Sequence, residues 1–222
     1  GYVSFQLDTS ITQLERQVKL SETNHRHLER QLATAHLLKG AMHVAEASTA
    51  KQGNGGNRAL VSSALNHFQS ALAVDKNDCE ALEYAAHMHI CLKQDKDADE
   101  LLNRVLGLTT PNAKSLSRAR AYRYKADIAT IGVAPKHLKD ALRALPNLHG
   151  DDRVEEAEMH EALADRQNAM RRHVQARSHW EIAKALYREL SGQQAVDAAE
   201  RVASKLAVLD QLPEQKDEDE ED

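Results

Sequence analysis

The chain has little of what β-rich, membrane-spanning and disulfide-bonded proteins depend on. Aromatic residues make up 4% of its 222 residues, and it has nine glycines, four prolines and two cysteines. Such a composition is typical of a helix-rich soluble protein, because strand-forming residues are scarce. The mean hydropathy is −0.61, and no apolar run approaches the ~18 residues that a membrane span needs. The start also lacks the basic, apolar and small-residue pattern of a signal peptide.

The two cysteines are predicted to be reduced. Cys79 and Cys91 fall on one predicted helix, where a rise of about 1.5 Å per residue separates them by roughly 18 Å, too far for a disulfide. Free thiols favour a cytosolic or nuclear protein, and of the two we predict a cytoplasmic one. The chain does not begin with Met, so we interpret residues 1–7 as a truncated or tag-derived lead, and a membrane anchor or another domain could precede it.

A spacing of small, large and small residues returns about every 34 residues. The second position lies four residues after the first, and the third lies three residues after the second. The pattern occurs at Ala64, Phe68 and Ala71; Ala98, Leu102 and Val105; Ala134, Leu138 and Ala141; and Ala176, Trp180 and Ala183. A period of this length indicates stacked helical units rather than one closed core.

The pattern resembles the tetratricopeptide repeat (TPR), whose two antiparallel helices carry Leu-Gly on the first and Ala, Phe and Ala on the second. We identify four degenerate repeats over residues 34–190. Their further marks are Gly40, Ala85-Ala86, Pro146 and Leu163-Ala164. The resemblance implies an all-α, right-handed helical-repeat solenoid over residues 35–212. The solenoid would end in an amphipathic capping helix at Gln193–Leu212, because arrays of this kind end on a polar face.

Residues 8–34 are predicted to form a coiled-coil-like helix. Its apolar seam steps alternately by three and four residues, with polar interruptions, through Ile11, Leu14, Val18, Ser21, His25, Leu28, Leu32 and Ala35. The seam predicts self-association as a homodimer through Leu14, Val18, His25, Leu28 and Leu32. The alternative is a long capping helix that packs on the repeats of its own chain.

The last ten residues, 213–222, are predicted to be a disordered acidic tail, because six acidic side chains in succession repel one another. They account for the net charge of −5, so the remainder of the chain is nearly neutral. A nearly neutral body argues against nucleic acid as a partner, since such proteins show a dominant basic field.

No motif in the sequence predicts an enzyme, a cofactor or a metal site. The pairs His25/His27 and His87/His89 have a spacing of two, which places the rings on different faces of a helix. The glycine-rich stretch 53–57 lacks the Lys-Ser/Thr of a phosphate-binding loop, and no nucleophile or zinc-protease motif occurs. We therefore predict no catalytic, cofactor-binding or metal-binding residues.

The TPR resemblance implies a protein or peptide partner, held in a groove lined by the first helices. The implied groove residues are Glu83, Tyr84 and His87 in the second repeat, Arg120 and Arg123 in the third, and Glu161 in the fourth. Glu83, His87 and Glu161 replace the donors that bind a chaperone's terminal carboxylate, whereas the two arginines suit an acidic peptide.

The sequence thus predicts an adaptor or scaffold that docks a peptide or partner helix on a TPR-like surface. The alternative is a non-catalytic structural or regulatory module of a larger protein, either membrane-anchored or enzymatic.

Overall fold

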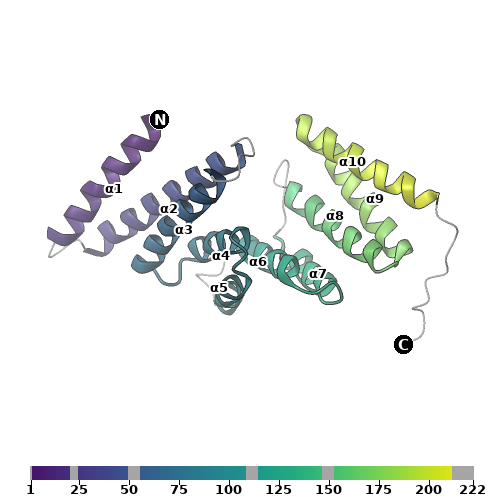
Figure 1. Ribbon diagram of the computed structural model, residues 1–222, viewed down its shortest axis with the longest axis horizontal. Helices are drawn as coiled ribbons and strands as arrows, with labels where there is room; N and C mark the ends of the chain where they lie inside the picture. Colours follow the sequence, from purple (N-terminus) through teal and green to yellow (C-terminus); the bar gives the residue numbers. More distant parts are fainter. Residues whose placement is uncertain (1, 21–24, 50–55, 109–114, 147–152, 212–222) are drawn as a thin grey trace. The chain divides into compact units, whose positions relative to one another are not determined.

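The computed structural model describes residues 2–20, 25–49, 56–108, 115–146 and 153–211, and these ranges contain helices and no strand. The helices, shown in Figure 1, are α1 (Tyr2–Leu20), α2 (His25–Thr49), α3 (Gly56–Val74), α4 (Cys79–Cys91), α5 (Asp95–Gly107), α6 (Ser115–Ile128), α7 (Ala134–Ala144), α8 (Val154–Ala169), α9 (His173–Glu189) and α10 (Gln193–Asp210). The predicted all-α class is confirmed.

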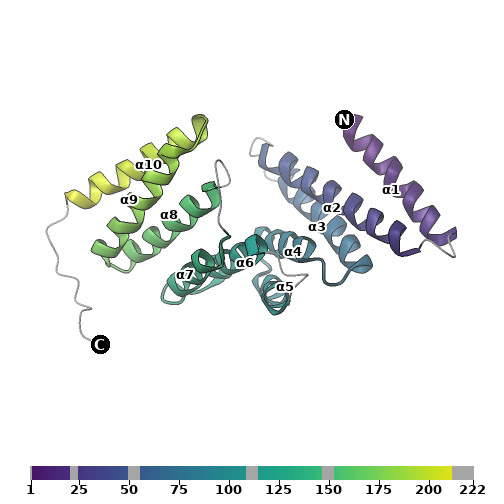
Figure 2. The ribbon, with the colours of Figure 1, turned by 180° about the vertical axis from the view of Figure 1, so that it is seen from behind.

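The chain divides into two compact units, Gly1–Ser117 and Arg118–Asp222. In the first, each of α1 to α4 packs against the helix that follows it. In the second, α7, α8, α9 and α10 pack in the same sequential way, and α6 shares buried clusters with α7 and α8. Figures 1 and 2 show these neighbours side by side from opposite directions. Packing on sequence neighbours is the arrangement expected of a helical-repeat protein.

The repeat positions found in the sequence form the core of both units. They lie on the second helix of each pair, α3, α5, α7 and α9, and all twelve side chains are buried. Phe68, Leu102 and Leu138 are among the largest fully buried side chains. The 34-residue period therefore marks the face by which each second helix packs on its neighbours.

The first helices contribute the small residues of these contacts. Gly40 on α2 lies against the ring of Phe68 on α3: a Cβ added at Gly40 would be 2.5 Å from Phe68 Cε1. Ala86 on α4 and Ala164 on α8 are also fully buried. A small residue here lets the two helix backbones approach while the large residue fills the space between them.

The N-terminal region differs from the single coiled-coil-like helix expected over residues 8–34. Helix α1 begins at Tyr2, within the supposed lead, and ends at Leu20, and α2 begins at His25. Ile11 on α1 is buried with Leu32 and Ala35 on α2. Within the described residues, this part of the seam packs within one chain, because α1 and α2 lie against each other.

A polar contact fastens the same hairpin. The Lys39 ammonium on α2 donates a 2.9 Å hydrogen bond to Asp8 Oδ2 on α1, and it also contacts Ser4. Lys39 is buried, so its charge requires this carboxylate partner.

The structure contains the amphipathic helix that the sequence predicts at the end of the repeats. Helix α10 begins at Gln193, as predicted, and ends at Asp210. Its buried face carries Ala195, Ala198, Ala199, Val202, Leu206 and Leu209. The predicted acidic tail lies outside the described residues.

We predict that Gly40→Ala lowers the free energy of unfolding by about 1–3 kcal/mol, because the new methyl group overlaps the buried Phe68 ring. Urea denaturation measures the change. Gly107→Ala is the matched control, since a Cβ there meets nothing within 4 Å. Gly40→Ala combined with Phe68→Leu should recover part of the loss, and a fully stable Gly40→Ala protein would contradict the packing.

We also predict that Trp180→Ala costs about 3–5 kcal/mol, because it removes a large buried side chain and leaves a cavity. Val174→Ala, at an exposed position of the same helix, should change the stability little. Thermal melting of the two variants provides the comparison. Equal melting temperatures would place Trp180 outside the core.

Candidate interaction surfaces

A stripe of carboxylates runs along α8. Glu155, Glu158, Glu161 and Asp165 follow one another at spacings of three, three and four, which places them on one face of the helix. The negative charges of these carboxylates repel one another unless cations lie opposite them. Basic side chains from α6 and from α10 supply the compensating charge.

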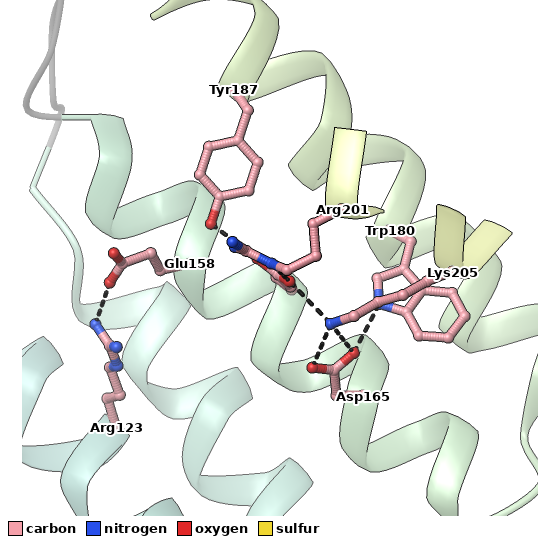
Figure 3. A network of polar contacts seen from close by, with 8 residues as sticks. Arg123, Glu158, Asp165, Trp180, Tyr187, Arg201 and Lys205 are labelled. Carbon is pink, nitrogen blue, oxygen red and sulfur yellow. Dashed lines mark hydrogen bonds and ion pairs between the residues drawn. The ribbon is translucent and has the colours of Figure 1, made fainter. Parts of the chain in front are cut away.

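The two arginines predicted to bind an acidic peptide contact the first half of this stripe. Arg120 donates to Glu155 Oε1 from Nε at 2.9 Å and from Nη2 at 2.6 Å. Arg123 Nη1 donates to Glu158 Oε2 at 2.6 Å, as Figure 3 shows. A carboxylate of the same chain therefore faces each of the two arginines.

The second half of the stripe is held by α10. Arg201 donates to both oxygens of Glu161, at 2.9 Å from Nε and 2.8 Å from Nη2. Lys205 Nζ reaches Glu161 Oε1 at 2.8 Å and both oxygens of Asp165 at 2.7 Å. Figure 3 shows Arg201 and Lys205 extending from α10 toward this part of α8.

Helix α9 completes this network from its buried face. Tyr187 Oη donates to Glu161 Oε2 at 3.0 Å, and Trp180 Nε1 donates to Asp165 Oδ1 at 2.9 Å. The aromatic rings fill the core, and their polar ends satisfy the carboxylates at its edge. The network therefore ties α8, α9 and α10 together.

The ionisation of Glu161 follows from these contacts. Burial alone would raise its pKa, but hydrogen bonds from Arg201, Lys205 and Tyr187 outweigh burial and hold the pKa at about 2. Burial and the adjacent Glu161 charge raise the pKa of Tyr187, so its hydroxyl keeps the proton that it donates. Glu161 is 7% exposed and has donors on both oxygens.

The sequence interpretation missed Arg201, Lys205 and Tyr187. A signal for the first two exists: Arg201 and Lys205 have the same spacing of four as Glu161 and Asp165, so one turn of α10 matches one turn of α8. Glu161 was read as a groove residue that repels a carboxylate ligand. In the structure it anchors the capping helix.

The second-repeat residues belong to the first unit and lie on α4. Glu83 is 1% exposed, so its side chain is out of reach of a ligand. Tyr84 is half-buried and stacks on Phe68, with ring centroids 5.2 Å apart. His87 is also half-buried. Tyr84 thus contributes to the packing of α3 and α4.

A groove of about 540 Å³ runs between α1 and α2. Its apolar wall consists of Leu7 and Leu14 on α1 and Ala35 and Leu38 on α2, and Leu38 is 54% exposed. Its polar lining consists of Ser10, Gln13, Gln17, Arg30, Gln31 and Thr34. Leu7/Leu14 and Gln31/Leu38 are each one heptad apart, so the groove follows the hairpin over about two turns.

The residues predicted for self-association divide between the groove and the hairpin core. Leu14 lines the groove, and Val18 packs on the cluster of Ile11 and Leu32. Leu32 is buried and Leu28 is half-buried. The side chain of His25 lies outside the described residues.

The described ranges hold neither a metal-binding cluster nor a membrane-spanning helix. No group of three or more His, Cys, Asp or Glu side chains is arranged there to hold a metal ion. None of the helices described combines the length and apolar character required to cross a membrane.

Comparison with known proteins returned similar solved structures. No family model matches the chain, and no curated protein does. The chain is similar to a tetratricopeptide repeat protein from Parabacteroides merdae ATCC 43184, at 14% identity over 95% of this chain and 88% of that one, with a TM-score of 0.41. It is also similar to a candidate protein-binding protein from Bacteroides ovatus ATCC 8483, at 14% identity over 91% of this chain and 98% of that one, with a TM-score of 0.26.

The fold itself defines the class, an all-α TPR-like helical-repeat protein. The assignment rests on the buried repeat positions and on the sequential packing of the helix pairs, since both likenesses are distant.

We predict that Glu161→Gln lowers the free energy of unfolding at pH 7 by about 2 kcal/mol. Buried ion pairs cost 3–5 kcal/mol when one partner is lost, but Arg201 is 55% exposed, and water will partly solvate it in the variant. Asp140→Asn, which breaks an exposed pair with Arg143 on α7, is the control and should cost less than ~1 kcal/mol.

The stabilities of the wild type and of Glu161→Gln can also be compared as a function of pH. The pKa of Glu161 lies near 2 in the folded chain and near 4.5 when unfolded, so its stabilisation is present above pH 4.5 and is lost as the pH falls through 2. The stability difference between wild type and Glu161→Gln should therefore shrink across this window. A difference in stability that stays constant between pH 4.5 and pH 2 would mean that Arg201 and Lys205 do not bind the ionised form of Glu161.

Proposed function

We propose that this chain is a non-catalytic protein-interaction module that docks an amphipathic partner helix in the groove between α1 and α2. The observation that carries the proposal is the apolar wall of that groove, which retains a half-exposed Leu38 beside Leu7 and Leu14. Large apolar side chains left open between two helices are what a third helix covers.

The chemistry of the groove specifies its occupant. Leucines one heptad apart match apolar residues at positions i, i+3 or i+4, and i+7 of a helix. Three glutamines and Arg30 along the lining offer hydrogen bonds to polar residues beside that apolar stripe. The occupant is thus a helix with a narrow apolar face rather than an extended acidic segment.

Charge supports this location over the α6 arginines. An acidic partner at Arg120 and Arg123 must displace Glu155 and Glu158, which already bind them at 2.6 Å. The entering carboxylates would replace existing ones, so the net gain is small. The groove between α1 and α2 requires no such exchange.

Selection of peptides tests the proposal directly. Helical 20-residue peptides selected by display against the full chain should carry the i, i+3 or i+4, i+7 apolar pattern. Leu38→Glu should weaken their binding at least tenfold, as expected for a charge facing an apolar stripe. Val208→Glu is the matched control, because Val208 is an exposed aliphatic residue (63%) on α10, and it should bind as the wild type does.

Two outcomes would contradict the proposal. One is the selection of acidic peptides whose binding survives Leu38→Glu but is lost in Arg120→Ala/Arg123→Ala. The other is a concentration-dependent dimer in sedimentation equilibrium that Leu38→Glu abolishes, since a second copy would then be the occupant. Unaltered secondary structure in Leu38→Glu, verified by circular dichroism, completes the comparison.

A further inference from the structure

Two pairs of histidines face each other across helix pairs, one pair in each compact unit. His36 Nδ1 on α2 lies 3.2 Å from His67 Nδ1 on α3. His160 Nδ1 on α8 lies 2.9 Å from His179 Nδ1 on α9. The ring centroids are 5.5 and 5.1 Å apart, and the ring planes meet at 32° and 33°. The two contacts therefore have nearly the same geometry.

The two pairs also occupy the same place in the repeat. His67 directly precedes Phe68, and His179 directly precedes Trp180, the large residues of their second helices. On the first helices, His36 lies four residues before Gly40, and His160 lies four residues before Ala164, the small residues. The first and fourth repeats thus carry one histidine contact at equivalent positions.

Packing alone does not require histidine at these positions. In the second repeat the equivalent residues are Leu82, four before Ala86, and Leu101, directly before Leu102. Leu82 is fully buried there. Leucine therefore occupies both positions in the second repeat, and the histidines add something that leucine cannot, which is the capacity to bind a proton.

The contact admits only one proton between its two nitrogens. A neutral imidazole has one N–H donor and one acceptor nitrogen, so one ring donates its Nδ1–H and the other accepts. One added proton leaves the contact in place, because the ring that donates Nδ1–H can carry the proton on Nε2. Protonation of both rings removes the acceptor and sets two positive N–H groups about 3 Å apart. Protonation of both rings and the helix contact are therefore mutually exclusive.

Charged neighbours modify this balance in the first unit. Glu15 Oε1 on α1 lies 3.9 Å from His36 Nε2 and favours protonation. Asp8 on α1 acts in the same direction on His67, whereas Lys39 and His43 on α2 oppose it. His43 also stacks on His67 with centroids 5.6 Å apart.

In the second unit, Glu156 on α8 favours protonation of His160, and Lys139 on α7 opposes protonation of His179. Burial is the largest influence on all four rings and lowers their pKa values, that of His160 to about 4. Both pairs are therefore neutral at pH 7.

We propose that the two histidine pairs are proton-operated clasps, which join the helices of the first and fourth repeats while at least one ring of each pair is neutral and release them when acidification protonates both rings. The unfolded chain, whose histidines titrate near 6.5, takes up protons before the folded chain does. The clasps are thus intact above pH 6.5 and weaken as the pH falls toward 4. The Glu161 window begins only near 4.5, so the range between pH 6.5 and 4.5 reports on the histidines.

Histidine NMR on the wild-type chain tests the first part of the proposal. The ring signals of His36, His67, His160 and His179, assigned by single substitutions, should titrate below pH 6.5, with His160 near 4. Midpoints at or above 6.5 would overturn the clasp.

Thermal melting of variants tests the second part. Two double variants place leucine at both positions, as in the second repeat: His36→Leu/His67→Leu and His160→Leu/His179→Leu. Each should remove part of the fall in Tm between pH 7 and pH 5 that the wild type shows. Retention of the full fall by both variants would overturn the proposal.

The control for melting is His89→Leu/His173→Leu, with one substitution in each unit. His89 contacts the side-chain oxygen of Gln94 at 2.8 Å and lies 4.0 Å from Asp97 Oδ2, and His173 contacts the side-chain oxygen of Asn168 at 3.1 Å, so the partners of both rings are oxygen atoms. This variant should keep the wild-type fall in Tm. If it removed the fall instead, general histidine titration rather than the paired contacts would be responsible. The NMR midpoints decide the matter should a leucine pair fail to fold.

Discussion

The structure depends on one steric constraint, the meeting of a small residue on the first helix of a pair with a large side chain on the second. Gly40 and Phe68 show it at its tightest, since a single added carbon would overlap the ring. The fully buried Ala164 and the nearly buried Trp180 occupy the same positions in the fourth repeat. Close approach of the backbones leaves each pair with an open apolar face, which the next pair covers. Each helix pair therefore packs on the next pair along the chain.

The charged side chains of the second unit stabilise the packing of its helices. The carboxylates of α8 would repel one another, and α6 and α10 each present two bases to them. Helix α10 is therefore fastened by ion pairs at one edge and by its apolar face elsewhere. Arg120, Arg123 and Glu161, which the sequence assigns to a ligand-binding groove, are therefore already paired with other side chains of the same chain. The groove between α1 and α2, where Leu38 remains exposed, is the docking surface that we propose.

Periodicity predicted the parts of the fold that a single helix determines. The small and large positions of α3, α5, α7 and α9, and the apolar face of α10, could be read from spacing, because each set lies on one side of one helix. The N-terminal seam shows the limit. Its spacing is equally suited to pairing between chains and to folding back, and Ile11 and Leu32 face each other across a hairpin that no spacing specifies. The shared face of Arg120 and Arg123 was likewise predictable, whereas their carboxylate partners 35 residues away were not.

The sequence by itself determined that the chain is an array of helix pairs, which side of each second helix is buried, and where the last helix starts. These are local properties, set by residues within two or three turns of one another. Only the tertiary structure decided that Glu161 holds Arg201 and Lys205, that Glu83 is buried, and that the paired histidines touch. Such contacts join residues from different helices. Their energies depend on burial and on distances of about 3 Å, which the order of residues along one helix does not contain.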